Sequence, residues 1–274
     1  MFKIIYKPSK ISSFQQIREF QKQNQIQKIG HSGTLDYLAC GLLLIATDED
    51  TKLLPYLQNK NKEYYVKAQL GYVSKTYDEE GPIESFSSYQ PNEDEVMQVI
   101  YSFLGKIKQI PPVFSAKKIK GKKAYELARK NQTIELKPID VTIYDIWDID
   151  YQYPFLEFKT KVSNGTYIRS LIHDIGLKLK TGAYITYLER TKIHGLGIND
   201  EINVEQLLSL KTYELESDEI LKKLFNGLKI KLKIANGEYL LKMKNEIIGI
   251  INVENNLVVK QKLFGNKVVE LIKI

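Results

Sequence analysis

A single carboxylate at the start of a hydrophobic run is the first candidate for chemistry in this sequence. Residues 28–47 read KIGHSGTLDYLACGLLLIAT, so the polar loop that carries Asp36 leads directly into a predicted buried strand. One interpretation is an Asx turn, in which the side chain accepts hydrogen bonds from its own loop. The other is a catalytic carboxylate held against an apolar wall, where burial changes its ionisation. Spacing alone leaves both interpretations open.

A carboxylate that is buried stays ionised only if a cation lies beside it. The segment SNGTYIRSLIHDIG, residues 163–176, offers Arg169 together with Tyr167, and both lie off the apolar stripe of a predicted helix. Arg169 could equally be a solvated helix residue, as most arginines are. The pairing of Asp36 with Arg169 is therefore a hypothesis at this point.

Other classes of active site find little support in the sequence. The three histidines and the single cysteine do not fall at any zinc spacing, and no glycine-rich phosphate loop is present. Cys40 lies inside the apolar run, where a cysteine usually behaves as a small hydrophobic residue. No second carboxylate is close to Asp36 in the sequence. The residues therefore indicate neither a zinc site nor a phosphate-binding loop.

The overall composition indicates a polyanionic partner. The chain has 274 residues with a formal net charge of +7, and its 18 tyrosines could stack on bases. A single cysteine excludes an intrachain disulfide and is typical of a reducing compartment. The sequence contains no signal-peptide pattern and no apolar run long enough to span a bilayer. We expect a cytoplasmic protein that does not interact with membranes.

Strands and helices are predicted in a mixed order, which favours an α+β fold. Beyond residue 225 the pattern changes to short strands, beginning with alternating leucine or isoleucine and lysine over 228–234. We predict a larger domain over 1–224 and a small β-barrel over 225–274. The predicted strands are 2–6, 42–45, 63–73, 141–149 and 155–163, and the predicted helices start at 12 or 13, 93, 123 and 165.

Five sequence blocks, in order and in register, resemble the TruB family of bacterial tRNA pseudouridine-55 synthases. They are GHSGTLD with LACG, KEYYVKAQLG, QIPPVFSAKKIKGKKAYELARK, NGTYIRSLIHDIG and YLERTKI, across residues 1 to about 197. The resemblance implies an enzyme that converts uridine 55 in the T loop of tRNA to pseudouridine, without cofactor or metal. It also implies a mixed, mainly antiparallel sheet flanked by helices, and the last 50 residues resemble a shortened PUA-type RNA-binding barrel.

The resemblance assigns roles to individual residues. Asp36 matches the family's catalytic aspartate, Tyr64 the tyrosine stacked on the target base, and Arg169 the arginine that pairs with the aspartate. Asp36 could attack the ribose, attack the base or remove a ribose proton, and the sequence does not choose among these routes. The matches to residues that line the base pocket are His31, Tyr167 and Leu188.

The segment 105–130 is predicted to be an insertion that grips RNA, although a lysine run can also be a solvated turn. We expect a monomer whose partner is the T stem-loop of tRNA. The alternative function is a non-catalytic tRNA-binding or RNA-folding protein on the same scaffold. The lysines expected to contact the RNA backbone are Lys117, Lys118, Lys120, Lys122 and Lys123.

Overall fold

The computed structural model describes residues 1–274 except 59, 115–117, 120–121, 124–135, 209 and 273–274. For residues 118–119 and 122–123 it describes the backbone alone, as the short paired strands β8 (Lys118–Ile119) and β9 (Lys122–Lys123). Three of the five predicted RNA-contacting lysines lie in this strand pair. The other two, Lys117 and Lys120, lie outside the described residues, as does most of the helix predicted from 123.

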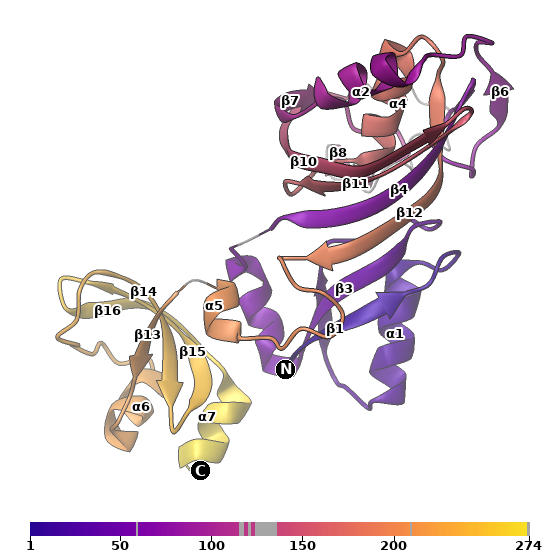
Figure 1. Ribbon diagram of the computed structural model, residues 1–274. Coiled ribbons are helices and arrows are strands. Elements are labelled where there is room, and N and C mark those ends of the chain that lie inside the picture. Colours follow the sequence, from indigo (N-terminus) through magenta and orange to yellow (C-terminus); the bar gives the residue numbers. More distant parts are fainter. Residues whose placement is uncertain (59, 115–117, 120–121, 124–135, 209, 273–274) are drawn as a thin grey trace.

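A long sheet forms the larger part of the molecule (Figure 1). Among the described residues it has eight strands in the order β1-β3-β12-β4-β11-β10-β7, with β2 paired to β3 off this path. Every neighbouring pair is antiparallel except β3 and β12, which run parallel. The prediction of a mixed, mainly antiparallel sheet is confirmed. The strands are β1 (Phe2–Lys7), β2 (Ile29–Ser32), β3 (Cys40–Thr47), β4 (Lys62–Leu70), β7 (Gly105–Gln109), β10 (Ile139–Gln152), β11 (Phe155–Val162) and β12 (Ala183–Ile193).

Both faces of the sheet are covered, which explains the continuous apolar run of β3. Side chains alternate across a strand, so Leu43 and Ile45 join the core under helices α1 (Ser13–Gln23), α2 (Glu93–Tyr101) and α4 (Ile168–Lys178). Leu42 and Leu44 point the other way and pack with the 3₁₀ helix η1 (Asp48–Tyr56) and α5 (Val204–Leu208). Cys40 is buried in this strand, as its sequence context predicted.

A second, smaller sheet forms the C-terminal part and lies beside the larger one (Figure 1). Its strand order is β13-β14-β15-β16, with β13 parallel to β14 and the other pairs antiparallel. The unit includes β13 and α6, so it begins upstream of the predicted boundary at 225. Its elements are β13 (Lys211–Glu214), α6 (Asp218–Phe225), β14 (Gly237–Met243), β15 (Glu246–Glu254), β16 (Leu257–Leu263) and α7 (Gly265–Ile272).

The two parts share a hydrophobic cluster, in which Phe2 and Leu44 of the larger sheet pack with Leu240, Ile250 and Phe264. The small sheet is therefore packed against the larger one rather than joined to it only by a linker.

The prediction of a strand over 228–234 is wrong. This segment forms only a single bridge, from Lys231 to Leu257. Leu228 is exposed, while Leu232 is buried, so the segment does not lie flat on the core along its length. Alternation of apolar and charged residues predicts a half-buried strand, but it does so only where a neighbouring strand edge is available along the whole segment.

The parallel pair β3–β12 depends on a glycine. Gly41 has φ +112°, and a Cβ atom there would lie 2.3 Å from the Arg190 carbonyl oxygen and 2.5 Å from its backbone nitrogen. We expect Gly41→Ala to lower the free energy of unfolding by about 2–5 kcal/mol, from backbone strain and steric overlap combined. Urea unfolding followed by circular dichroism measures this loss.

Gly105→Ala is the matched control for this substitution. Gly105 also has a positive φ, +91°, but nothing lies within 4 Å of the position of its Cβ. Gly105→Ala should therefore lower the free energy of unfolding only by the cost of backbone strain, about 1–2 kcal/mol. Equal losses in the two variants would show that the close approach of β3 to β12 is unimportant.

Candidate active site

The structure brings Asp36 and Arg169 together, although they are 133 residues apart in the sequence. Asp36 lies in the loop between β2 and β3, and Arg169 lies in the first turn of α4. The guanidinium donates from Nε to Oδ2 and from Nη2 to Oδ1, each at 2.9 Å. This is the two-pronged geometry that fixes a carboxylate in one orientation. The hypothesis that these two side chains pair is confirmed.

Further contacts hold the Arg169 guanidinium in place. It donates to the carbonyl oxygens of Thr76 and Phe114, each at 3.0 Å, and its Nη1 lies 3.3 Å from a carboxylate oxygen of Asp78. Burial lowers the pKa of Arg169, but the carboxylates of Asp36 and Asp78 raise it more, so the net pKa is above its usual value. Arg169 is therefore a permanent cation within the protein.

The two carboxylates beside Arg169 differ in exposure. The Asp78 side chain is 6% exposed, whereas the Asp36 side chain is 43% exposed. Arg169 itself is only 5% exposed. Asp78 therefore supports Arg169 from within the protein, while Asp36 remains accessible to a molecule that enters from solvent.

A tight turn after β5 (Tyr72–Ser74) positions Asp78. Its Oδ1 accepts hydrogen bonds from the Thr76 hydroxyl at 2.5 Å and from the backbone N–H of Glu80 at 3.0 Å. Asp78 also forms a backbone bridge to Ile185 of β12. No local sequence pattern distinguishes Asp78 from an ordinary turn aspartate, so its contact with Arg169 was not predicted.

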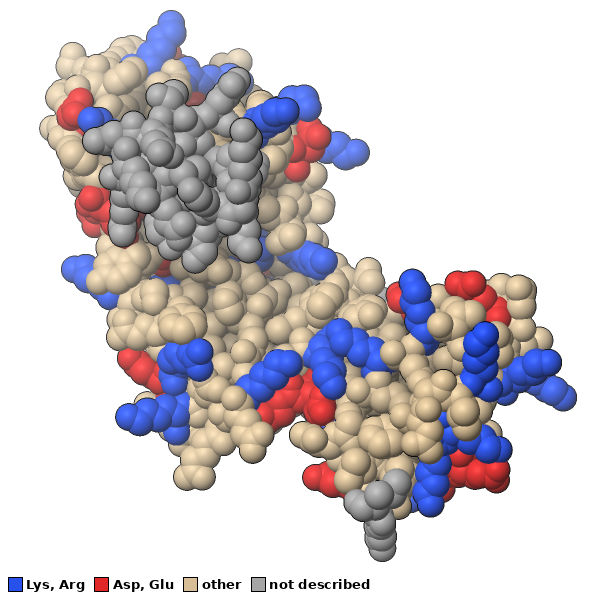
Figure 2. Space-filling view, turned by 180° about the vertical axis from the view of Figure 1, so that it is seen from behind, with Lys and Arg blue, Asp and Glu red and all other residues tan. Residues whose placement is uncertain are grey.

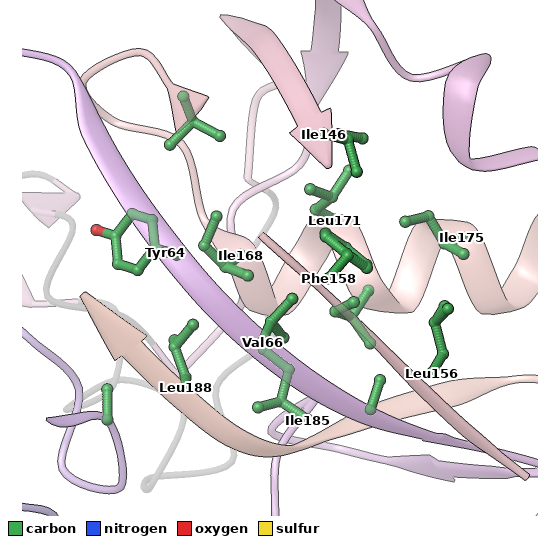
Figure 3. Close-up of a cluster of buried hydrophobic side chains, with 14 of the residues drawn as sticks. Tyr64, Val66, Ile146, Leu156, Phe158, Ile168, Leu171, Ile175, Ile185 and Leu188 are labelled. Carbon is green, nitrogen blue, oxygen red and sulfur yellow. The ribbon is translucent and has the colours of Figure 1, made fainter. Parts of the chain in front are cut away.

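A pocket of about 300 Å³ opens in front of Asp36. Tyr64 of β4, Leu188 of β12 and Ile168 of α4 form one end of the large hydrophobic cluster and line the pocket (Figure 3). This volume is at the lower end of the range for small-molecule sites and suits a single nucleoside better than a larger ligand. The polar part of its lining comes from Thr34, Lys62, Asn164, Thr166 and Tyr167.

Tyr64 presents a neutral ring to this pocket. Burial and the nearby Asp36 carboxylate raise its pKa, and only part of this rise is offset by the charge of Arg190 and by a hydrogen bond to it. The phenol therefore stays protonated at neutral and moderately alkaline pH. Its strand neighbours, Thr160 of β11 and Arg190 of β12, pair with it on both sides and fix the position of its backbone.

Five of the six residues predicted at the site border one pocket or contact its carboxylate. Tyr167 and Leu188 line it with Tyr64 and Asp36, and Arg169 lies behind Asp36.

His31 is placed differently from the other five. It lies on β2 and lines a separate pocket with Phe14 and Ile17 of α1. Burial, together with the charge of Arg190, lowers the pKa of His31, so the imidazole is neutral at pH 7. Its assignment to the base pocket stays a prediction.

Lys62 is a pocket residue that the sequence analysis did not single out. It starts β4, two residues before Tyr64, and its side chain lines the same pocket. Strand alternation would have found it, because residues two apart on a strand point to the same face.

No group of three or more histidine, cysteine, aspartate or glutamate side chains in the described part of the chain is arranged to hold a metal ion. Within the same residues, no helix is both long enough and apolar enough to cross a membrane.

Comparison with solved structures supports the fold. The chain superimposes on a protein in the "Crystal Structure of a Cbf5-Nop10-Gar1 Complex" with a TM-score of 0.67, over 96% of this chain and 84% of that one. Sequence identity is 21%, so this likeness concerns the fold alone. A second match, "Structure of H/ACA RNP bound to a substrate RNA containing 2'-deoxyuridine", has a TM-score of 0.61 at 20% identity.

Comparison of sequences shows the family. Residues 21–168 match the model of the TruB family pseudouridylate synthase N-terminal domain, and residues 169–232 match the tRNA pseudouridylate synthase B C-terminal domain. The tRNA pseudouridine synthase B of Mycoplasma mobile is 43% identical over 99% of this chain and 97% of its own length. That of Mycoplasmopsis pulmonis is 44% identical, over 100% and 98%. With both family models matched in sequence order and relatives similar along the whole chain, the protein belongs to the TruB family of pseudouridylate synthases.

Proposed function

We propose that this protein isomerises uridine 55 in the T loop of tRNA to pseudouridine, with Asp36 as the group that acts on the flipped nucleotide. Membership of the TruB family makes the chain an isomerase that acts on tRNA. The single observation that carries the role of Asp36 is its position: a carboxylate held by Arg169 and half exposed at a pocket of about 300 Å³ that has a hydrophobic wall.

The pocket is suited to a flipped base. Extruding a nucleotide from a folded RNA loop costs a few kcal/mol. Stacking on an aromatic side chain returns about 1–3 kcal/mol per base, and Tyr64 offers such a ring. The apolar wall at Leu188 and Ile168 offers a detached uracil few polar groups, which favours its retention while it rotates.

The reaction exchanges one bond for another. The N1–C1′ bond of the uridine breaks and a C5–C1′ bond forms, while the proton on C5 is lost and N1 gains one. No net oxidation takes place. Asp36 would act as a carboxylate to attack C1′, to attack the base or to remove a ribose proton, and its two hydrogen bonds from Arg169 hold it in one orientation for any of these steps.

Incubation with an unmodified tRNA transcript tests this proposal. Pseudouridine is then mapped by reverse-transcription stops that depend on carbodiimide treatment. A new stop at position 55 alone supports the proposal. A stop elsewhere in the tRNA contradicts the assigned position, and the absence of any stop contradicts the activity.

The alternative, a non-catalytic tRNA-binding or RNA-folding protein, has one observation in its favour. Exposed lysine side chains gather over the C-terminal unit, among them Lys229, Lys231, Lys233, Lys260 and Lys262 (Figure 2). Such a surface can bind RNA whether or not the pocket is active. The same transcript assay separates the two functions, because a pure binding protein produces no stop.

Replacement of Tyr64 tests the stacking role. We expect Tyr64→Leu to lower kcat/KM by about 5- to 150-fold, the equivalent of one lost stacking interaction of about 1–3 kcal/mol. Tyr64→Phe keeps the aromatic ring and should lower kcat/KM much less. Initial rates over a range of tRNA concentrations measure the effect.

Tyr65→Leu is the matched control for the stacking test. Tyr65 lies next to Tyr64 on the same strand, and its hydroxyl donates a hydrogen bond to Glu157, away from the pocket. A loss in Tyr65→Leu as large as that in Tyr64→Leu would contradict the stacking role.

A further inference from the structure

Two cations come to the pocket from β4 and β12, apart from the Asp36–Arg169 pair, and neither has a carboxylate partner among the described ion pairs. They are Lys62 of β4, which lines the pocket, and the buried Arg190 of β12, which contacts the lining residue Gly33. Arg169 contacts two carboxylates, whereas Lys62 and Arg190 contact neutral oxygens. A buried charge is costly unless it is paired, so this side of the site carries uncompensated positive charge.

Arg190 is the more deeply buried of the two, with 1% of the residue exposed. Its Nε donates to the carbonyl oxygen of Leu42 at 2.7 Å, and its Nη2 donates to that of Gly33 at 2.9 Å. These contacts fix the guanidinium behind the loop that carries Asp36. They satisfy hydrogen bonds, but they leave the charge of the guanidinium unneutralised.

Lys62 brings the second charge to the pocket. Its Nζ donates to the Asn164 side-chain oxygen at 2.8 Å, which holds the ammonium group at the turn before α4. Gly33 lies between the two cations: a Cβ atom there would be 3.3 Å from Lys62 Cε and 3.5 Å from Arg190 Nη1. Burial, together with the charges of Arg190 and Lys60, lowers the pKa of Lys62 to about 8. An anion bound beside Lys62 would relieve this repulsion.

We propose that Lys62, held by Asn164 and backed by the buried Arg190, binds a phosphate group that flanks the flipped uridine. This proposal rests on the proposed function, since the phosphate belongs to the RNA whose uridine enters the pocket. In this arrangement β4 carries two contacts to the same nucleotide, since Tyr64 contacts the base and Lys62 contacts the backbone. The two residues share one face of the strand and are about 6.6 Å apart along it, a separation suited to a base and its own phosphate.

The surroundings of Asn164 support a path for the adjoining RNA chain. Asn164 also borders a larger groove of about 750 Å³, which Lys60 and Lys106 line as well. Lys108 lies in the same groove, where it pairs with Asp140 at 3.0 Å. An RNA strand that leaves the pocket past Asn164 therefore enters a groove with positive charge along its wall.

A chemical double-mutant cycle tests the contact directly. T-stem-loop RNAs carry one neutral methylphosphonate, placed 5′ or 3′ to the target uridine, and the protein carries Lys62→Gln. All proteins also carry Asp36→Asn, so that Kd is measured without turnover. We expect the methylphosphonate on one side, and Lys62→Gln, each to raise Kd by about 10- to 100-fold. Combining the two should raise Kd no further than either alone.

The controls separate a local contact from general electrostatics. Lys60→Gln removes a neighbouring exposed charge, and in this variant the methylphosphonate should raise Kd by the same factor as it does without the substitution. Lys62→Arg keeps the charge and should retain most of the affinity. If Lys62→Gln fails to fold, Asn164→Asp replaces it, since a carboxylate beside Lys62 should weaken RNA binding by a similar factor.

The results distinguish this proposal from the proposed function. The phosphate contact would be overturned if the increases in Kd from Lys62→Gln and from the methylphosphonate were additive at both phosphate positions. It would also be overturned by a Lys62→Gln protein with Asp36 intact that loses kcat, if Lys62→Gln leaves Kd for RNA unchanged in the Asp36→Asn background, since that result indicates a role in proton transfer. Pseudouridine formation by the otherwise unaltered protein is measured separately. If position 55 is modified while the increases in Kd are additive, only the phosphate contact fails.

The pH dependence of RNA binding gives a second readout. The groups that face Lys62 are Arg190 from β12, Lys60 from the segment before β4, and the neutral amide of Asn164. A lysine whose pKa is about 8 loses its proton as the pH rises through 8, and its attraction for phosphate is lost with it. Binding should therefore weaken between pH 7 and pH 8.5 in a protein with Lys62. A Lys62→Gln protein with the same pH dependence would contradict the proposal.

Discussion

Asp36→Asn should abolish pseudouridine formation while leaving the fold and tRNA binding intact. The amide has nearly the same shape as the carboxylate, but it carries no charge and is neither a useful nucleophile nor a base. Loss of such a group lowers turnover by about 10⁴-fold or more. Single-turnover assays with excess enzyme measure the rate, and filter binding measures Kd for the tRNA. The far-ultraviolet circular dichroism spectrum should be unchanged.

Asp148→Asn is the matched control for this experiment. Asp148 is also an aspartate paired with a cation, Lys159 at 2.9 Å, but it is 61% exposed and lies away from the pocket. It should retain full activity. Residual turnover of Asp36→Asn above about one hundredth of the normal rate would contradict a direct chemical role for Asp36. If both binding and activity were lost, the substitution would have disturbed the site as a whole.

Arg169→Leu should be the most destabilising substitution at the site. It leaves Asp78 buried without its cation, and removing one partner of a buried ion pair costs about 3–5 kcal/mol. The carbonyl groups of Thr76 and Phe114 lose their donor at the same time. Urea unfolding should show a lower midpoint with an unchanged slope. Activity should fall as well, because Asp36 loses the group that orients it.

The double variant Arg169→Leu with Asp78→Asn separates the cost of the unpaired carboxylate from the loss of packing. It should be more stable than Arg169→Leu alone, because the amide of residue 78 is cheaper to bury than an unpaired charge. Arg18→Leu on the exposed side of α1 is the control and should change stability by no more than about 0.5 kcal/mol. If Arg169→Leu lowered the free energy of unfolding by no more than this, the buried cation would not stabilise the fold.

The sequence by itself determined the elements and much of the site chemistry. The apolar run around Leu42–Ile45 predicted a buried strand, and the alternation over 155–163 predicted β11, because both patterns are local consequences of which strand faces are covered. The apolar stripe after Gly165 predicted α4 and placed Arg169 off that apolar stripe, although the structure buries Arg169 as well. Ordered sequence blocks identified the family, and with it the residues expected at the pocket.

Only the tertiary structure decided which of these residues meet. Asp36 and Arg169 are brought together by the packing of α4 against the loop before β3, a contact between segments 133 residues apart. The same packing of distant segments brings Asp78, Lys62 and Arg190 to the site, and it places His31 at a separate pocket beside α1. Local periodicity records which face of an element is buried. The order of strands in a sheet, and therefore which charges lie side by side, depends on how distant segments pack, and no spacing along the chain records it.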